Sequence, residues 1–121
     1  MYNILICDDE KDIVSALKIY LKTSGYNIYE AYNGKEALEQ IKEHDIHLVL
    51  MDIMMPVMDG LEATRQIRAM NRLDAKLIPI AAMSANAFQD DVERSKKAGM
   101  NKHISKPLTG EGVIREIKSM L

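Results

Sequence analysis

The sequence predicts an α/β fold in which a five-stranded parallel sheet is covered by helices on both faces. Short apolar runs alternate five times with segments whose apolar residues recur at helical spacing. Parallel neighbours need crossover connections, and right-handed crossovers place helices on the faces of the sheet. At 121 residues the chain is near the commonest length for one domain, and we expect residues 1–121 to form one.

The first half of the chain supplies three strands and two helices. The apolar run over residues 4–7 predicts a first strand over 4–8, and a helical stripe from Ile13 to Leu21 follows it. Residues 27–31 alternate weakly, as an edge strand does, and the Asn33-Gly34 turn leads into the second helical stripe. Residues 47–52 form the most apolar strand, which indicates burial on both faces.

The second half repeats the pattern after Pro56 and Asp59-Gly60 break the chain. The expected elements are a helix from Leu61, a strand over 77–83, a helix over 85–98, a strand over 102–105 and a helix from Val113 to Leu121. The fourth strand is expected despite Pro79, and Gly99 is expected to end the fourth helix.

Composition limits the kind of protein this can be. Hydrophobic residues make up 47% and charged residues 28%, which is enough to build a core, and the net charge of −2 disfavours nucleic-acid binding by this segment. No apolar stretch approaches the ~18 residues that span a bilayer, and the start lacks the pattern of a signal peptide. Cys7 is the one cysteine and has no partner for a disulfide. We therefore expect a cytoplasmic protein that does not bind membranes.

Polar residues of the kinds that bind phosphate and metal ions stand where the apolar runs end. They are Asp8-Asp9 at the first strand, Asp52 at the third, Ser84 at the fourth and Lys106 at the fifth. Because ligands of open parallel sheets bind at the carboxyl ends of the strands, we expect these side chains to converge. Three carboxylates within ~5 Å repel by about 3 kcal/mol per pair, and Mg²⁺ is the natural compensating cation. The available chemistry is phosphoryl transfer to Asp52, with Lys106 and Ser84 holding phosphoryl oxygens.

Several of these residues, though not Asp52, also have a plainer interpretation, and the residues alone leave it open. The acids Asp9 and Glu10 can simply favour the start of the following helix. Ser84 can be the N-cap of the next helix, and Lys106 can be a surface lysine before a loop. Cys7 is expected to be a small core residue whose side chain points away from Asp8.

Taken together, the motifs resemble the receiver domain of two-component response regulators. The motifs are Asp8-Asp9, Met51-Asp52-Ile53-Met54-Met55-Pro56 with Asp59-Gly60, Ala82-Met83-Ser84-Ala85 and Lys106-Pro107. The set is specific in this order, and the resemblance extends over the whole chain. It implies a doubly wound, flavodoxin-like sheet of strand order 2-1-3-4-5 with five helices.

The resemblance also implies a role for each residue. Asp52 corresponds to the phosphoacceptor, Ser84 to the switch hydroxyl, and Lys106 to the lysine that pairs with the acyl phosphate. The implied Mg²⁺ ligands are Asp8, Asp9, Asp52 and the backbone carbonyl of Met54. The implied partners are a sensor histidine kinase or phosphotransfer protein, which donates the phosphoryl group, and a downstream output domain or protein.

Three positions depart from the family pattern. His103 stands at the aromatic switch position, where a smaller and more polar ring changes the coupling to Ser84. Met54 stands where the family influences hydrolysis of the phosphoryl group, and a thioether cannot orient a water, so we expect a long-lived phosphorylated form. Asn101 and Lys102 stand where an acid is common, which leaves open whether a homodimer forms through this face.

Two other functions remain alternatives at this point. A metal-dependent phosphohydrolase that forms an aspartyl phosphate would often have a second acid two residues after the nucleophile, where this chain has Met54. A pseudo-receiver would be an interaction module that is never phosphorylated, although the intact set of acids argues against it. The chain itself can be a single-domain regulator or a receiver excised from a longer protein.

Overall fold

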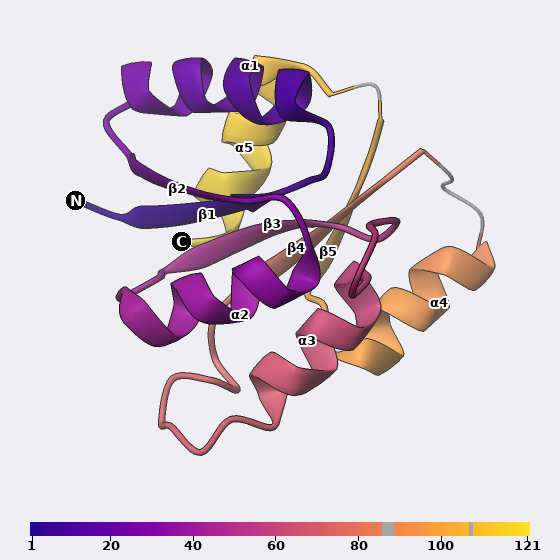
Figure 1. Ribbon diagram of the computed structural model, residues 1–121. Coiled ribbons are helices and arrows are strands. Elements are labelled where there is room, and N and C mark those ends of the chain that lie inside the picture. Colours follow the sequence, from indigo (N-terminus) through magenta and orange to yellow (C-terminus); the bar gives the residue numbers. More distant parts are fainter. Residues whose placement is uncertain (86–88, 107) are drawn as a thin grey trace.

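A computed structural model describes residues 1–85, 89–106 and 108–121 and shows one five-stranded parallel sheet (Figure 1). The strands are β1 (Asn3–Cys7), β2 (Asn27–Ala31), β3 (Leu48–Asp52), β4 (Ile80–Ser84) and β5 (Lys102–Ser105). Their order in the sheet is β2-β1-β3-β4-β5, and every neighbouring pair is parallel. The predicted fold class and strand order are therefore confirmed.

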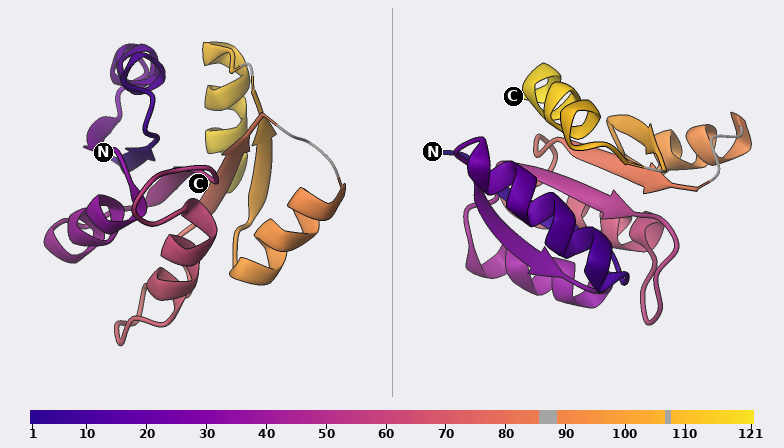
Figure 2. Two further views of the ribbon diagram at one scale, coloured as in Figure 1. Left: turned by 45° about the vertical axis from the view of Figure 1, so that its right-hand side comes forward. Right: turned by 90° about the horizontal axis from the view of Figure 1, so that it is seen from above.

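Five helices cover the two faces of this sheet. They are α1 (Lys11–Thr23), α2 (Gly34–Glu43), α3 (Gly60–Arg68), α4 (Gln89–Ala98) and α5 (Gly110–Met120). Helices α1 and α5 lie on one face, and α2, α3 and α4 lie on the other, as the views of Figures 1 and 2 show. The direction in which strands are added reverses after β2, so right-handed crossovers place α1 on one face and α2, α3 and α4 on the other.

Alternation along the strands divides the core into two layers. On β1, Ile4 and Ile6 pack with α1 and α5, whereas Leu5 and Cys7 pack with α2 and α3. Every residue of β3 is buried, so this central strand contributes to both layers. Each large aliphatic side chain buried there stabilises the fold by roughly 1.5–3 kcal/mol. Asp52, the last residue of β3, is the one polar residue in that run.

The fourth strand begins later than the sequence predicted. We expected residues 77–83, but β4 is Ile80–Ser84, and Leu77 is 78% exposed. The N–H groups of Leu77 and Ile78 donate to Asp74 O at 2.9 and 3.0 Å, which is a turn rather than a strand. Pro79 has no N–H to donate, so the strand starts after it.

The fourth helix also differs from the prediction of residues 85–98. Helix α4 begins at Gln89, and residues 86–88 of the expected helix lie outside the described residues. Ser84 is the last residue of β4 and not the first residue of a helix, so the N-cap interpretation of Ser84 was wrong. Gly99 has φ +109°, a left-handed conformation, and ends α4 as expected.

Among the described helix starts, three have a side-chain N-cap. The side chains of Asn33, Asp59 and Thr109 accept hydrogen bonds from the backbone N–H groups of Glu36, Glu62 and Gly112. Helix α1 has no such cap, because its N-cap Glu10 makes no side-chain bond to the helix. The cap by Asp59 fixes where α3 begins, directly after the loop that follows β3.

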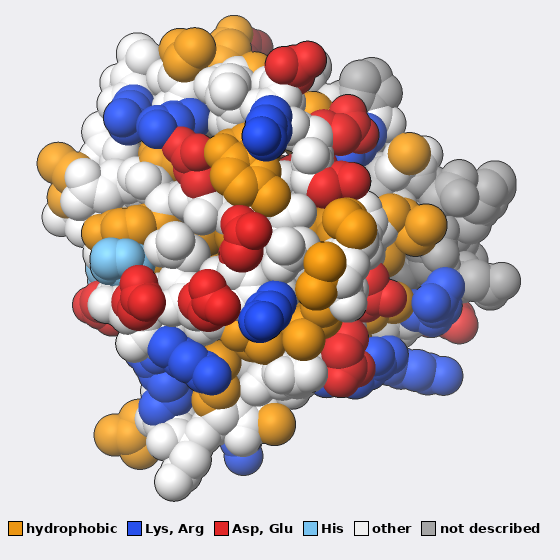
Figure 3. All heavy atoms as spheres, viewed as in Figure 1, with side chains coloured by type: hydrophobic (Ala, Val, Ile, Leu, Met, Phe, Trp, Pro, Cys, Tyr) orange, Lys and Arg blue, Asp and Glu red, His pale blue; other side chains and the backbone are white. Residues whose placement is uncertain are grey.

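Surface charge and helix length bear on what the molecule can bind. On the face shown in Figure 3, acidic and basic side chains are interspersed rather than separated into regions of one sign. Among the described residues, no helix combines the length and the apolar character that crossing a membrane requires.

The loop between β3 and α3 contains a strained turn. Val57 has φ +68°, and it is the one non-glycine residue with positive φ among those described. The Met58 N–H donates to Pro56 O at 2.7 Å, which closes a three-residue γ-turn around Val57. A β-branched residue in this conformation costs roughly 1–3 kcal/mol, and such strain persists only where neighbours hold it.

We expect Val57→Gly to raise the free energy of unfolding by about 1 kcal/mol, because glycine adopts positive φ without a steric cost. Val57→Ala is the matched control, since it keeps the Cβ atom that causes the strain. Denaturant unfolding of the three proteins measures the effect. A glycine variant no more stable than the alanine variant would contradict the strained turn.

Candidate functional site

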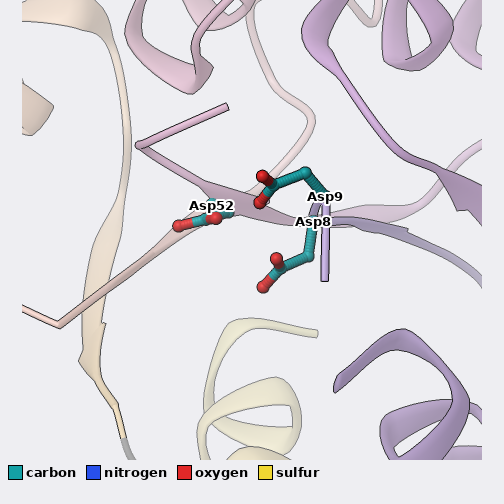
Figure 4. A group of neighbouring side chains, drawn as sticks. All are labelled: Asp8, Asp9 and Asp52. Atoms are coloured by element: carbon teal, nitrogen blue, oxygen red, sulfur yellow. The ribbon is translucent and has the colours of Figure 1, made fainter. Parts of the chain in front are cut away.

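Three carboxylates meet where β1 and β3 end. Cys7 and Met51 are register partners in the sheet, so the next residues, Asp8 and Asp52, lie at the same edge. One oxygen from each of Asp8, Asp9 and Asp52 lies within 4.8 Å of the others, and Figure 4 shows all three groups extending to the same side. Asp8 is fully buried and Asp52 is 4% exposed, whereas Asp9 is exposed. The predicted convergence of the acids is present.

Lys106 points into this group from the end of β5. Its Nζ atom lies 3.0 Å from Asp8 Oδ2 and 3.6 Å from Asp52 Oδ2, and its side chain is 14% exposed. The Lys106 N–H donates to Ser84 O at 2.8 Å, which joins the two strand ends. The interpretation of Lys106 as a surface lysine was therefore wrong.

Hydrogen bonds and close packing of the backbone hold Asp8 and Asp52 next to each other. Asp8 donates its N–H to Ala31 O at 3.1 Å, and its Oδ1 accepts the Glu10 N–H at 2.9 Å. Beyond Asp52, the Ile53 N–H donates to Met83 O at 3.1 Å. A Cβ atom on Gly60 would lie 2.1 Å from Asp52 O, so only glycine permits this approach of α3 to the end of β3.

Burial and neighbouring charge perturb the ionisation of the pocket. Burial, followed by the charge of Asp8, raises the pKa of Asp52 to about 7. Burial alone would lower the pKa of Lys106, but its hydrogen bond to Asp8 and the charge of Asp52 outweigh burial and raise it. The ammonium therefore stays charged, and Asp52 gives up its proton less readily than an ordinary aspartate.

The donor set fits a hard divalent cation. Three carboxylates against one ammonium leave excess negative charge in a space where ligand oxygens are within 4.8 Å of one another. Mg²⁺ prefers carboxylate oxygens as ligands and usually retains several water molecules. Asp9 is exposed, so the site has room for these waters. Asp8, Asp9 and Asp52 could hold the ion without rearrangement of the strands.

Ser84 and Met54 line a hollow beside the acids. Ser84, the last residue of β4, is 6% exposed, and the Met54 side chain on the loop after β3 is 77% exposed. Both border a hollow of about 310 Å³, together with Ile53 and Asp59. The structure thus places Ser84 and Met54 at the same edge of the sheet as the carboxylates.

Comparison with known proteins agrees with this geometry. Residues 4–118 match the family described as the response regulator receiver domain. The chain belongs to this family.

Solved receiver structures resemble the chain over almost its whole length. Chemotaxis protein CheY4 of Vibrio cholerae has a TM-score of 0.95 at 25% identity, with 100% of this chain and 99% of that chain covered. The receiver domain of sensor histidine kinase PA1611 from Pseudomonas aeruginosa, with a magnesium ion coordinated in its active-site cleft, has a TM-score of 0.89 at 31% identity, with 98% and 96% covered. A receiver domain of a histidine kinase from Syntrophus aciditrophicus has a TM-score of 0.89 at 28% identity, with 100% of this chain and 90% of that chain covered.

His103 lies apart from the acids of the receiver. It pairs in register with Ala82 and borders two hollows of about 230 and 50 Å³ near α5 and α4. Both ring nitrogens are buried, and neither has a hydrogen-bond partner among the residues that the structure describes. An unsatisfied buried polar group costs about 1–3 kcal/mol, so burial of this ring makes the present conformation less stable.

Sequence reasoning missed one charged neighbour of the site. The Glu10 carboxylate lies 3.9 Å from Lys106 Nζ and is largely exposed. The signal was the unbroken acidic run from Asp8 to Glu10, in which we interpreted Glu10 only as favouring a helix start. Cys7 behaves as predicted: its thiol contacts Met55 and Asn33 on the α2 side, and burial raises its pKa.

We expect the metal-free receiver to become less stable, relative to Asp52→Asn, as the pH rises. The Asp52 carboxyl ionises near pH 7 when folded and near 3.8 when unfolded, so the folded state binds the extra proton between these values. The difference in unfolding free energy should fall through this window by at most about 1.4 kcal/mol per pH unit. Denaturant unfolding in EDTA at several pH values measures it, and parallel curves for the two proteins would disprove the shift.

Proposed function

We propose that this chain is a phosphorylation-dependent switch of a two-component system, with Asp52 as the phosphoacceptor. The observation that carries the proposal is the packing of Asp8, Asp9, Asp52 and Lys106 into one pocket at the strand ends. Membership of the receiver family supports a role in signalling, where the donor is a histidine kinase or phosphotransfer protein. In this proposal no substrate is turned over.

The transfer itself uses one carboxylate oxygen of Asp52. That oxygen forms a bond to phosphorus as the bond from phosphorus to the donor's histidine nitrogen breaks, and the nitrogen keeps the bonding electrons. The donor's ring, protonated on its other nitrogen, leaves as a neutral imidazole, and the product is an acyl phosphate on Asp52. Lys106, already 3.6 Å from Asp52 Oδ2, binds a phosphoryl oxygen as the new negative charge develops.

The proposal places Mg²⁺ at Asp8, Asp9, Asp52 and the Met54 carbonyl. When bound, the ion offsets the negative charge of the phosphoryl oxygens and of the carboxylates. The magnesium in the Pseudomonas receiver domain at 31% identity supports this assignment. Asp8 contributes by holding Lys106 at 3.0 Å, so the ammonium stays in the pocket.

Phosphorylation then shifts an equilibrium between two surface conformations. In the proposal the Ser84 hydroxyl binds a phosphoryl oxygen, and the face built from β4, α4, β5 and α5 changes for an output domain or protein. His103 lies on that face with two unsatisfied ring nitrogens among the described residues, so a change there can relieve the cost of its burial.

The two alternative functions lack a supporting observation in the site. A phosphohydrolase would often need an acid two residues after Asp52, and Met54 with its exposed thioether stands there. A pseudo-receiver would not need the buried ion pair of Lys106 with Asp8, which is in place.

Incubation with Mg²⁺ and a small acyl phosphate should add one phosphoryl group to the wild type and none to Asp52→Asn. The amide of the variant cannot attack phosphorus, although its shape is preserved. Intact-protein mass spectrometry measures the gain, and omission of Mg²⁺ with EDTA is the control. A variant that gains the same mass would place the modification elsewhere and end the proposal for Asp52.

Phosphorylated Met54→Asn should lose its phosphoryl group several times faster than the wild type. An amide can orient an attacking water beside the acyl phosphate, whereas the thioether of Met54 cannot. Met54→Leu is the matched control and should decay at the wild-type rate. Faster loss from the wild type than from Met54→Asn, followed by mass spectrometry over time, would contradict the long-lived state.

A further inference from the structure

The loop between β3 and α3 is fixed to the rest of the receiver at both ends. At its start, the Ile53 N–H donates to Met83 O at 3.1 Å on the neighbouring strand. At its end, the Gly60 N–H donates back to Ile53 O at 2.9 Å. These bonds close the loop at its base, but they do not explain why its outer part keeps the strained γ-turn at Val57.

The outer part of the loop is held by the first residue of α2. The Gly34 N–H donates to Met58 O at 2.9 Å, directly after the strained Val57. The first N–H groups of a helix have no partner within the helix, so this donor is available to the loop. A Cβ atom at position 34 would lie 2.6 Å from Met58 O and 2.9 Å from Met58 Cγ, so glycine is required for the contact.

A second contact ties the same parts together. The Cys7 thiol lies 3.4 Å from Met55 Sδ and donates to Asn33 O at 3.3 Å. Cys7 directly precedes Asp8, and Asn33 caps α2 through its bond to Glu36. The acid pair, the start of α2 and the loop of Met54 therefore form one contact group.

We propose that Gly34 is a positioning residue for the metal site. By binding the Met58 carbonyl, its N–H holds the strained loop that also carries the Met54 carbonyl, and so fixes where that carbonyl lies relative to the acids. The inference rests on the proposed function, because Met54 matters in this way only if its carbonyl is a Mg²⁺ ligand. Gly34 itself touches neither the cation nor the phosphoryl group.

The test is the affinity for Mg²⁺ alone, measured by isothermal titration calorimetry. Gly34→Ala should weaken binding by about tenfold, as loss of groups that orient metal ligands commonly does. Gly112→Ala is the matched control: the Gly112 N–H donates to Thr109 Oγ1 at 3.1 Å, and its added Cβ would lie 2.8 Å from that oxygen. It adds a methyl group against the capping oxygen at the start of α5, a milder conflict than that with the Met58 carbonyl, and should leave Mg²⁺ affinity unchanged.

A rescue experiment separates positioning from general damage. Val57→Gly removes the strain that Gly34 holds, so Gly34→Ala/Val57→Gly should bind Mg²⁺ more tightly than Gly34→Ala alone. If Gly34→Ala does not fold, Gly34→Ala/Ala63→Gly takes its place, because the Ala63 Cβ atom lies 3.0 Å from the added methyl group. That variant keeps the conflict with Met58 O.

The outcomes distinguish this inference from the proposed function. A wild-type receiver that binds no Mg²⁺ would refute the proposed metal site. A wild type that binds Mg²⁺ as tightly as Gly34→Ala would overturn the role of Gly34 alone. Equal weakening in Gly34→Ala and Gly112→Ala, or no rescue by Val57→Gly, would also overturn it, since the effect would then follow stability and not the loop.

Discussion

The site of this receiver depends on one constraint: three carboxylates that repel one another are held close together. Hydrogen bonds along β1 and β3 fix where Asp8 and Asp52 stand, and their oxygens remain within 4.8 Å of one another and of Asp9. Lys106 offsets only part of this charge. In the proposed function the incoming phosphoryl group is itself an anion, so a cation bound beside Asp52 would favour its approach.

In the proposed function, backbone bonds at the sheet edge give a route from Asp52 to the face that contains β5. Ile53 donates to Met83, and Lys106 donates to Ser84, so the ends of β3, β4 and β5 are joined by backbone bonds. A displacement of the Ser84 backbone would therefore act directly on the residue that follows β5. Because β5 is partly exposed and lies at the edge of the sheet, it has fewer neighbours that resist movement than β3 has.

Much of this arrangement could be predicted from residue order, because parallel strands bring their carboxyl ends to one edge. Asp8, Asp9, Asp52 and Lys106 meet for that reason alone. The start of β4 was misplaced because apolar character suggested a strand where Pro79 removes a donor. Contacts such as that of Gly34 with Met58 were beyond sequence reasoning, because they depend on how two loops pack and leave no local pattern.

The ionisation of Asp52 has a consequence for how the receiver responds to its surroundings. With a pKa of about 7, roughly half of these carboxyls carry a proton in neutral solution. Protons and cations compete for the same oxygens, so uptake of a cation liberates a fraction of a proton into the buffer. Acidity and the concentration of free magnesium would then have opposing effects on how much of the Asp52 carboxyl is ionised.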